Sequence, residues 1–410
     1  MSRSEPEFEP LLTKLRQHLL EQRYGSGARF NYPHVARPFL RHLAKNGQVI
    51  ETVSAADVAR YLDSLKLKRY RRPFPDHSRR MHRASIHMLL RLVQGRWPPV
   101  AALASAHERA TQTIVMSFDT WMTELRGLSP NTRRHLRAAM CSLLEWLHEQ
   151  NKGMAKLTID DLDIYVAKRY AGMRRNSKAG AASNLRTVLR YLHEHGHLGR
   201  DLAPLVKGPM MYALEGIPAT INPEDVQRAL AALKHDRSAT GRRDYAIWIL
   251  LTTYGLRGGE IKALELPDID WRHERLRIRH GKTGAYSDLP LLRKPANALL
   301  DYLRHGRPAT ASRTVFLRAQ APYRPLAIST PLHGVVSRRL AAVGVVPTGK
   351  HGTHALRHAR AVSLLRGGVS LKVIGDVLGH RSERSTAVYL KLATEDLRSV
   401  ALDLPAKVAS

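Results

Sequence analysis

The sequence is poor in cysteine, in acidic residues and in long apolar runs, and each shortage excludes something. Cys141 is the only cysteine in 410 residues, so a disulfide within the chain and a zinc site of several thiolates are both excluded. The apolar run at residues 246–251 is far shorter than the roughly 20 residues that span a bilayer. The first residues, MSRSEPEFEP, lack the apolar stretch of a signal peptide. We therefore expect a reduced, cytoplasmic protein that does not enter a membrane.

The shortage of acidic residues indicates a polyanionic partner. The chain has 66 Lys and Arg against 35 Asp and Glu, a formal net charge of +31. Folding does not need this imbalance, and self-repulsion opposes it. Ribosomal and membrane-surface proteins share such a balance, but the hydrophobic content of 43% also allows a full core. We expect a folded protein of about two or three domains that binds double-stranded DNA.

The first half of the chain repeats itself. FLRHLAKNGQVIETVSAADVARYL (residues 39–62) aligns without a gap on LLEWLHEQNKGMAKLTIDDLDIYV (residues 143–166), at a constant offset of 104. Both segments contain a hydroxyl residue followed three positions later by an acid, Ser54 with Asp57 and Thr158 with Asp161. This spacing is typical of a helix N-cap. It predicts two similar helical domains in tandem, and the alternative is a chance match of two amphipathic helices.

Breakers and periodicity predict the domain organisation. We expect an extra helical domain at residues 1–104, a core helical domain at 105–207, a Gly/Pro-rich linker at 208–218 and a third domain at 219–410. In the third domain we expect a buried helix at 243–254 stopped by Gly255, two strands within 275–291 and a weaker strand at 314–318. Helical patterns follow at 332–343, 355–366, 371–378 and 385–391. The predicted fold is mainly α, with a small antiparallel sheet.

Clusters of cations predict where DNA is contacted. The densest run is KLKRYRRPFPDHSRRMHR at residues 66–83, which also contains two aromatic residues. A solvated loop is the plain explanation, and a surface that follows the phosphate backbone is the functional one. The residues that we expect to contact DNA are Lys66, Lys68, Arg69, Arg71, Arg72, Arg79, Arg80, Arg133, Arg134, Arg174 and Arg175.

Polar residues suited to phosphate chemistry follow one another in the third domain. YGLRGGE places an arginine three residues before an acid, and HGKTGAYS places a lysine on a turn between the expected strands. THALRH carries His354 and Arg357 three apart, on one face of a helix expected to begin at Thr353. LGHRSERSTAVYL then places His380 nine residues before Tyr389. Each residue alone has an ordinary structural explanation, so the order of the set is the signal.

This series resembles the catalytic domain of the tyrosine site-specific recombinases, the phage integrase family, whose chemistry type IB topoisomerases share. The resemblance covers about residues 220–400, and residues 110–205 are more weakly similar to the family's SAM-like core-binding domain. It implies a DNA-breaking and rejoining enzyme that needs neither metal nor other cofactor. It also implies a homotetramer, or a mixed assembly with sister recombinases, on two DNA sites. Gly259 departs from the serine that is common there in the family.

The resemblance implies a role for each residue. Arg257 and Arg357 would clamp the non-bridging phosphate oxygens, because guanidinium groups stay charged and offer forked donors. Lys282 would protonate the departing 5′ oxygen, which a guanidinium cannot do. Together these three cations would stabilise the charge that grows in the transition state.

The remaining residues complete the implied reaction. Tyr389 would attack phosphorus and leave a 3′-phosphotyrosine, which conserves the bond energy for rejoining. His354 would donate to the phosphate or accept the tyrosine proton, and His380 would hold another oxygen. Glu260 would support the site by orienting His354 or by holding a backbone turn.

Other interpretations stay open. The same fold could bind DNA without cutting it, or the enzyme could be a topoisomerase. GVVPTGKH (residues 344–351) nearly matches a phosphate-binding loop, but it ends in His351 where a hydroxyl is needed for magnesium. His351, His354 and His358 have a zinc-like spacing without an accompanying H-E-x-x-H pattern or cysteine. We expect neither a nucleotide site nor a metal site.

Overall fold

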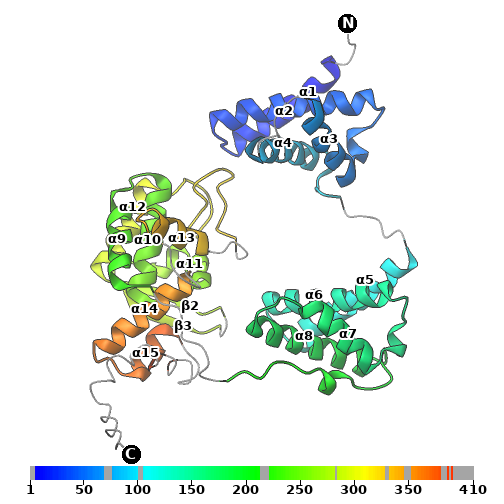
Figure 1. Cartoon of the computed structure of the whole chain (residues 1–410). Coiled ribbons are helices and arrows are strands. Elements are labelled where there is room, and N and C mark those ends of the chain that lie inside the picture. The colour runs from blue at the N-terminus through cyan, green and yellow to red at the C-terminus, as the bar shows by residue number, and fades with distance from the viewer. Residues whose placement is uncertain are drawn as a thin grey trace, which may run out of the picture. The chain divides into compact units, whose positions relative to one another are not determined.

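The computed structural model describes residues 5–68, 76–99, 105–212, 221–281, 284–327, 332–345, 352–379, 386 and 389–390, without the side chains of 5–7, 66–68, 76 and 77. The chain divides into two compact units, residues 1–99 together with 216–410, and residues 100–215. Helices dominate both units, which confirms the predicted mainly α class (Figure 1). Among the described helices, none combines the length and the apolar character that crossing a bilayer requires.

The first helical bundle has a hydrophobic core of its own. It consists of α1 (Glu5–Glu21), α2 (Ser26–Lys45), the short η1 (Ile50–Thr52), α3 (Ala55–Lys68) and α4 (Asp76–Gln94). Leu12, Phe39 and Ile86 are fully buried between these helices. Ser54 Oγ accepts a hydrogen bond from the Asp57 amide at 3.2 Å, and the Asp57 carboxylate accepts one from the Ser54 amide at 2.8 Å. The predicted N-cap of α3 is therefore confirmed.

The second helical bundle follows the same order. It consists of α5 (Ala106–Thr120), η2 (Trp121–Leu125), α6 (Pro130–Glu149), η3 (Met154–Lys156), α7 (Ile159–Tyr170), α8 (Arg175–Glu194) and η4 (Ala203–Leu205). The predicted apolar face of residues 136–147 is buried on α6. Thr158 caps α7 as predicted, with its hydroxyl 3.3 Å from the Asp161 amide.

The third region surrounds a long buried helix with helices and a small sheet. Its helices are α9 (Pro223–His235), α10 (Ala239–Tyr254), α11 (Gly258–Ala263), η5 (Leu266–Asp268), α12 (Arg293–His305), α13 (His333–Ala341), α14 (Thr353–Arg366) and α15 (Leu371–Leu378). The antiparallel sheet has the order β1 (Ile269–Asp270), β2 (Arg275–Arg279), β3 (Tyr286–Pro290), with Leu276 opposite Leu289. The middle of α10 is wholly buried and provides the core on which α12 and α14 pack.

Most predicted elements of this region are confirmed, and one is wrong. Gly255 ends α10 in the left-handed conformation (φ 66°), and α14 begins at Thr353 as expected. The strand expected at 314–318 forms only isolated bridges, Glu265 with Thr314 and Leu317 with Pro325, among the described residues. Its apolar pattern reflects burial of Val315, Phe316 and Leu317 in the core, which needs no strand ladder. The helix expected at 385–391 lies largely outside the described residues.

Candidate active site

Arg257 is positioned by the turn between α10 and α11. The left-handed Gly255 turns the chain, and Arg257 then stands in extended conformation as the residue before α11. Its backbone amide donates to Glu260 Oε2 at 2.7 Å, and its Nη1 donates to Glu260 Oε1 at 2.8 Å. One carboxylate therefore caps the helix and fixes the guanidinium, whose side chain is 24% exposed.

Glu260 is the centre of a buried polar cluster. Its carboxylate also accepts from His280 Nδ1 at 2.8 Å, and His280 Nε2 lies 2.8 Å from Ser287 Oγ. Burial raises the pKa of Glu260, but hydrogen bonds from His280 and Arg257 outweigh burial and hold the pKa below its usual value. We expected Glu260 to orient His354 or to hold a backbone turn. Its carboxylate accepts a hydrogen bond from the Arg257 amide at the turn before α11, and it also binds the side chains of Arg257 and His280.

No separate signal in the sequence pointed to His280. It lies two residues before Lys282, directly after β2, and only the fold brings it to Glu260. A Cβ added to Gly379 would lie 2.4 Å from the His280 ring, and Gly379 has φ +61°. This glycine is therefore required both by its backbone conformation and by the close approach of the histidine.

Arg357 is buried within α14 and bound by main-chain carbonyls. Its side chain donates to Gly255 O at 2.8 Å and to Leu378 O. Burial lowers the pKa of Arg357, and the charge of Arg257 lowers it further. A guanidinium titrates so far above neutrality that it stays cationic. His354 lies one turn earlier on α14 and is exposed.

The two arginines converge on the end of α15. Arg257 Nη2 donates to Gly379 O at 3.1 Å, and Arg357 donates to the preceding carbonyl, Leu378 O. Guanidinium groups that are 100 positions apart in the chain are thus bound to consecutive carbonyls. The fold therefore builds a concentrated positive charge immediately before His380.

Tyr389 lies beside this charge but inside an apolar cluster. It is 1% exposed and packs with Ala361, Ile374 and Leu378. Burial raises the pKa of its phenol, and the charges of Arg357 and Arg257 and a hydrogen bond with Arg357 oppose that rise. The tyrosine is therefore near the cations while its phenolate is disfavoured.

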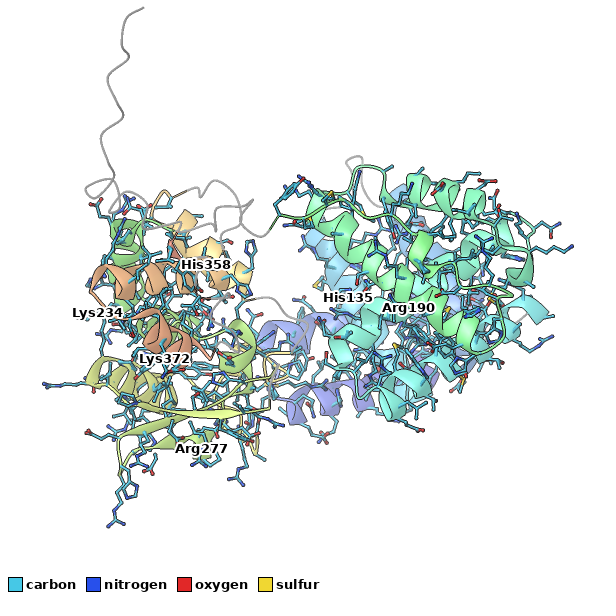
Figure 2. All side chains as sticks on the ribbon, turned by 90° about the horizontal axis from the view of Figure 1, so that it is seen from below. His135, Arg190, Lys234, Arg277, His358 and Lys372 are labelled. Carbon is cyan, nitrogen blue, oxygen red and sulfur yellow. The ribbon has the colours of Figure 1, made fainter. Side chains whose placement is uncertain are left out.

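His358 is a second residue that the sequence argument did not assign to the site. It follows Arg357 on α14 (Figure 2), and its ring centroid is 5.4 Å from that of Tyr389. Burial lowers the pKa of His358 to about 4, and the nearby His354 and Arg357 lower it as well. Its Nδ1 is buried with no hydrogen-bond partner among the described residues. The sequence singled it out only as a member of the zinc-like triplet, and its position next to Arg357 is the signal that could have assigned it to this site.

Lys282 and His380 lie outside the described residues. Their described neighbours nevertheless meet, because His280 and Gly379 are in close contact. The Gly284 amide donates to His280 O at 2.8 Å, which closes the chain around the turn after β2. His351, a member of the zinc-like triplet, also lies outside, and the described part of the chain holds no group of three candidate metal ligands.

The predicted DNA-contacting cations whose side chains the structure describes lie on both helical bundles. Arg79 pairs with Asp63 at 3.0 Å, and Arg80 is exposed on α4. In the second bundle, Arg134 donates to Asn131 Oδ1 at 2.6 Å, and Arg175 donates to Met210 O at 2.5 Å. Arg133 donates to Thr123 and pairs with Asp119, and Arg174 lies directly before α8. Lys66 and Lys68 lie at the end of α3, where side chains are not described. Arg69, Arg71 and Arg72 lie outside the described residues.

Two clustered arginines thus lie beside a buried tyrosine at the end of a mainly helical domain. The phage integrase family model matches residues 219–396, and the model of the phage integrase N-terminal SAM-like domain matches residues 115–196. The chain belongs to the phage integrase family of tyrosine recombinases.

Related proteins agree with this assignment. Putative integrase/recombinase y4rA of Sinorhizobium fredii is 32% identical over 94% of this chain and 92% of its own length. Tyrosine recombinase XerC of Mycobacterium tuberculosis is 30% identical over 70% of this chain and 97% of its own. Putative integrase/recombinase y4gC of S. fredii is 52% identical, over 46% of this chain and 97% of its own.

Solved structures show the same fold. XerH recombinase in a post-cleavage complex with difH DNA covers 84% of this chain and 93% of its own, with a TM-score of 0.54 and 14% identity. A lambda integrase dimer bound to a COC′ core site covers 82% of this chain and 91% of its own, with a TM-score of 0.53 and 16% identity.

Proposed function

We propose that this recombinase breaks and rejoins duplex DNA at specific sites, with Tyr389 as the nucleophile. The observation that carries the proposal is the convergence of Arg257 and Arg357 on the consecutive carbonyls of Leu378 and Gly379, next to Tyr389. Two fixed guanidinium groups match the non-bridging oxygens of one phosphodiester. They act in a largely buried site, where a fixed charge stabilises a transition state more strongly than it does in water.

The proposed step is a balanced transesterification. The Tyr389 oxygen bonds to phosphorus as the bond from phosphorus to the 5′ oxygen breaks. His354 accepts the phenol proton, and Lys282 gives a proton to the 5′ oxygen. His380 holds another phosphate oxygen. Attack by the 5′ hydroxyl of the same or another strand reverses the step, so rejoining needs no added energy source.

Glu260 and His280 support this step without touching the phosphate. Glu260 binds both ring and guanidinium donors, so it fixes Arg257 relative to the strand that leads to Lys282. A catalytic cation must be held within a fraction of an ångström of its productive position. We assign both residues as positioning residues.

The assembly follows from the same proposal. XerH and lambda integrase were captured on DNA, and one lambda integrase structure is a tetramer on a Holliday junction. For this chain we propose a homotetramer, or a mixed assembly with sister recombinases, that joins two duplexes in the cytoplasm. The domains at 1–104, 105–207 and 219–410, with a linker at 208–218, are proposed to work as separate modules. The two bundle cores use residues 8–97 and 115–206, within the first two ranges.

Covalent trapping tests the function. The full chain is incubated, in EDTA, with nicked duplexes taken from DNA that flanks its gene, and adducts are separated on denaturing gels. We expect an adduct with the wild-type protein and none with Tyr389→Phe, which removes one hydroxyl and keeps the ring. Tyr286→Phe, an exposed tyrosine on β3, is the matched control and should still form the adduct. An adduct that persists in Tyr389→Phe contradicts the proposal, and tight binding without any adduct favours the architectural role.

A further inference from the structure

The extra N-terminal bundle repeats the family-matched bundle element by element. The helices α2 and α6 begin 104 residues apart and end 104 residues apart, as do η1 and η3. The helices α3 and α7 also begin 104 residues apart. The SAM-like family model covers the second copy, at residues 115–196.

Side-chain contacts repeat as well. Gln48 donates to the capping acid Asp57, and the equivalent Lys152 pairs with the capping acid Asp161. The buried Tyr61 packs against the ring of His42 at 5.0 Å. At the equivalent positions, 104 residues later, Tyr165 packs against Trp146 at 5.5 Å. The two bundles therefore use one packing solution and are two copies of one module.

The last α-helix of each copy is basic, with a single acid at one end. In α8 the only acid is Glu194, its final residue, and four cations precede it. In α4 the only acid is Asp76, its first residue, and no Asp or Glu follows before residue 108. Residues 77–107 contain five arginines over that span. The basic helix is therefore α4 in the first copy and the corresponding α8 in the second. Figure 2 labels Arg190 on α8.

Three of the four arginines of α4 lie along one face. Arg80, Arg83, His87 and Arg91 are spaced by three, four and four residues, which places them on one side of the helix. All three arginines are exposed, whereas Ile86 and Leu89 are buried on another side. Burial lowers the pKa of His87, and the charges of Arg91 and Arg83 lower it further. Both arginines are therefore close enough to His87 to interact with it electrostatically. At 1.5 Å per residue the row is about 16 Å long.

We propose that α4 is a second DNA-binding surface, which contacts the phosphates of duplex DNA through Arg80, Arg83 and Arg91. The inference rests on the proposed function in taking DNA as the partner. A helix fits the major groove, and three exposed arginines along one face suit the regularly spaced phosphates beside it. One protomer would then hold DNA with two copies of the same module besides its catalytic domain.

The test measures how salt weakens DNA binding by the full chain. The background variant is Tyr389→Phe, so that binding is measured without cleavage, and the probe is a duplex of arbitrary sequence long enough for both modules. The test variant combines Arg80→Gln, Arg83→Gln and Arg91→Gln. Because each lost phosphate contact reduces the slope of log K against log salt by about 0.9, we expect the slope to fall by about 2 to 3.

A control variant separates location from net charge. Arg16→Gln, Arg41→Gln and Arg60→Gln remove the same charge from exposed positions on other helices of the bundle. They should leave the slope nearly unchanged. Lysine at the three α4 positions should retain most of the slope and shows that the helix still folds. An unchanged slope in the α4 variant overturns the proposal, and so does an equal fall in both glutamine variants.

Two further readouts distinguish this proposal from others. If the α4 variant leaves the salt slope intact but alters protein association on DNA, the surface binds protein and the proposal is wrong. With Tyr389 restored, the α4 variant should still form the covalent adduct at saturating protein. If the salt slope of the α4 variant is unchanged while the wild-type protein forms the adduct, only the proposal of a second DNA surface is overturned. Absence of the adduct in the wild-type protein overturns the proposed function itself.

Discussion

The catalytic region contains two neighbouring parts that differ in how they are held. The arginine pair is fixed by polar contacts, since Arg257 and Arg357 bind Glu260 and the carbonyls of Gly255, Leu378 and Gly379. Tyr389 is held by apolar neighbours and is almost completely buried. The electrostatic part of the site is therefore organised in advance, whereas Tyr389, the proposed nucleophile, must gain access to phosphate.

The largest effect is expected from the arginine pair. Arg257→Ala removes the charge of the partly exposed arginine of the pair. We expect the rate of cleavage to fall roughly 100- to 1,000-fold, as for other oxyanion donors. Single-turnover adduct formation measures it. Arg257→Lys should recover only part of the rate, because an ammonium lacks the forked donor geometry. Full activity of Arg257→Ala would remove this residue from the chemistry.

The same substitution at Arg357 should also affect folding. Arg357→Ala leaves the buried carbonyls of Gly255 and Leu378 without donors, and each unsatisfied group costs about 1–3 kcal/mol. Urea unfolding should show this loss for Arg357→Ala and much less for Arg257→Ala, whose side chain is 24% exposed. Equal destabilisation of the two variants would contradict the difference in burial.

Removal of the buried Glu260 carboxylate should affect both stability and adduct formation. Glu260→Ala leaves His280 and Arg257 without their carboxylate, and breaking a buried pair costs about 3–5 kcal/mol. We expect reduced stability and slower adduct formation, measured by urea unfolding and single-turnover kinetics. Ser287→Ala removes only the outer contact of His280 and should cost about 1 kcal/mol. A larger effect from Ser287 than from Glu260 would contradict the order of the cluster.

His358, which packs against Tyr389, should make the stability of the protein depend on pH. Burial lowers the pKa of His358 to about 4 from 6.5, so between these values the unfolded chain binds a proton that the folded chain does not. Stability should therefore fall as pH falls from 6.5 to 4, by on the order of 2–3 kcal/mol. The free energy of unfolding against pH measures this, and His358→Gln should flatten the curve over that window. An unchanged curve would exclude His358 as its source.

The sequence predicted both N-caps and the end of α10 at Gly255, because these depend on local spacing. It did not predict that Glu260 binds His280, since the two lie on different elements that only the fold brings together. The false strand at 314–318 has a related cause: burial produces an apolar run whether or not a neighbouring strand is present. Burial is the ordinary expectation for a lone tyrosine, but the cluster that buries Tyr389 depends on how α14 and α15 pack.

The most direct test of this account is the titration of Tyr389 in the DNA-free protein. Tyrosine labelled with carbon-13 at Cζ reports its ionisation by NMR, and Tyr389→Phe identifies the resonance. Because burial disfavours the phenolate more than Arg357 and Arg257 favour it, we expect the pKa of Tyr389 to lie above the ordinary value of about 10. A pKa at or below that value would show a tyrosine already activated by the cations, and would contradict the account.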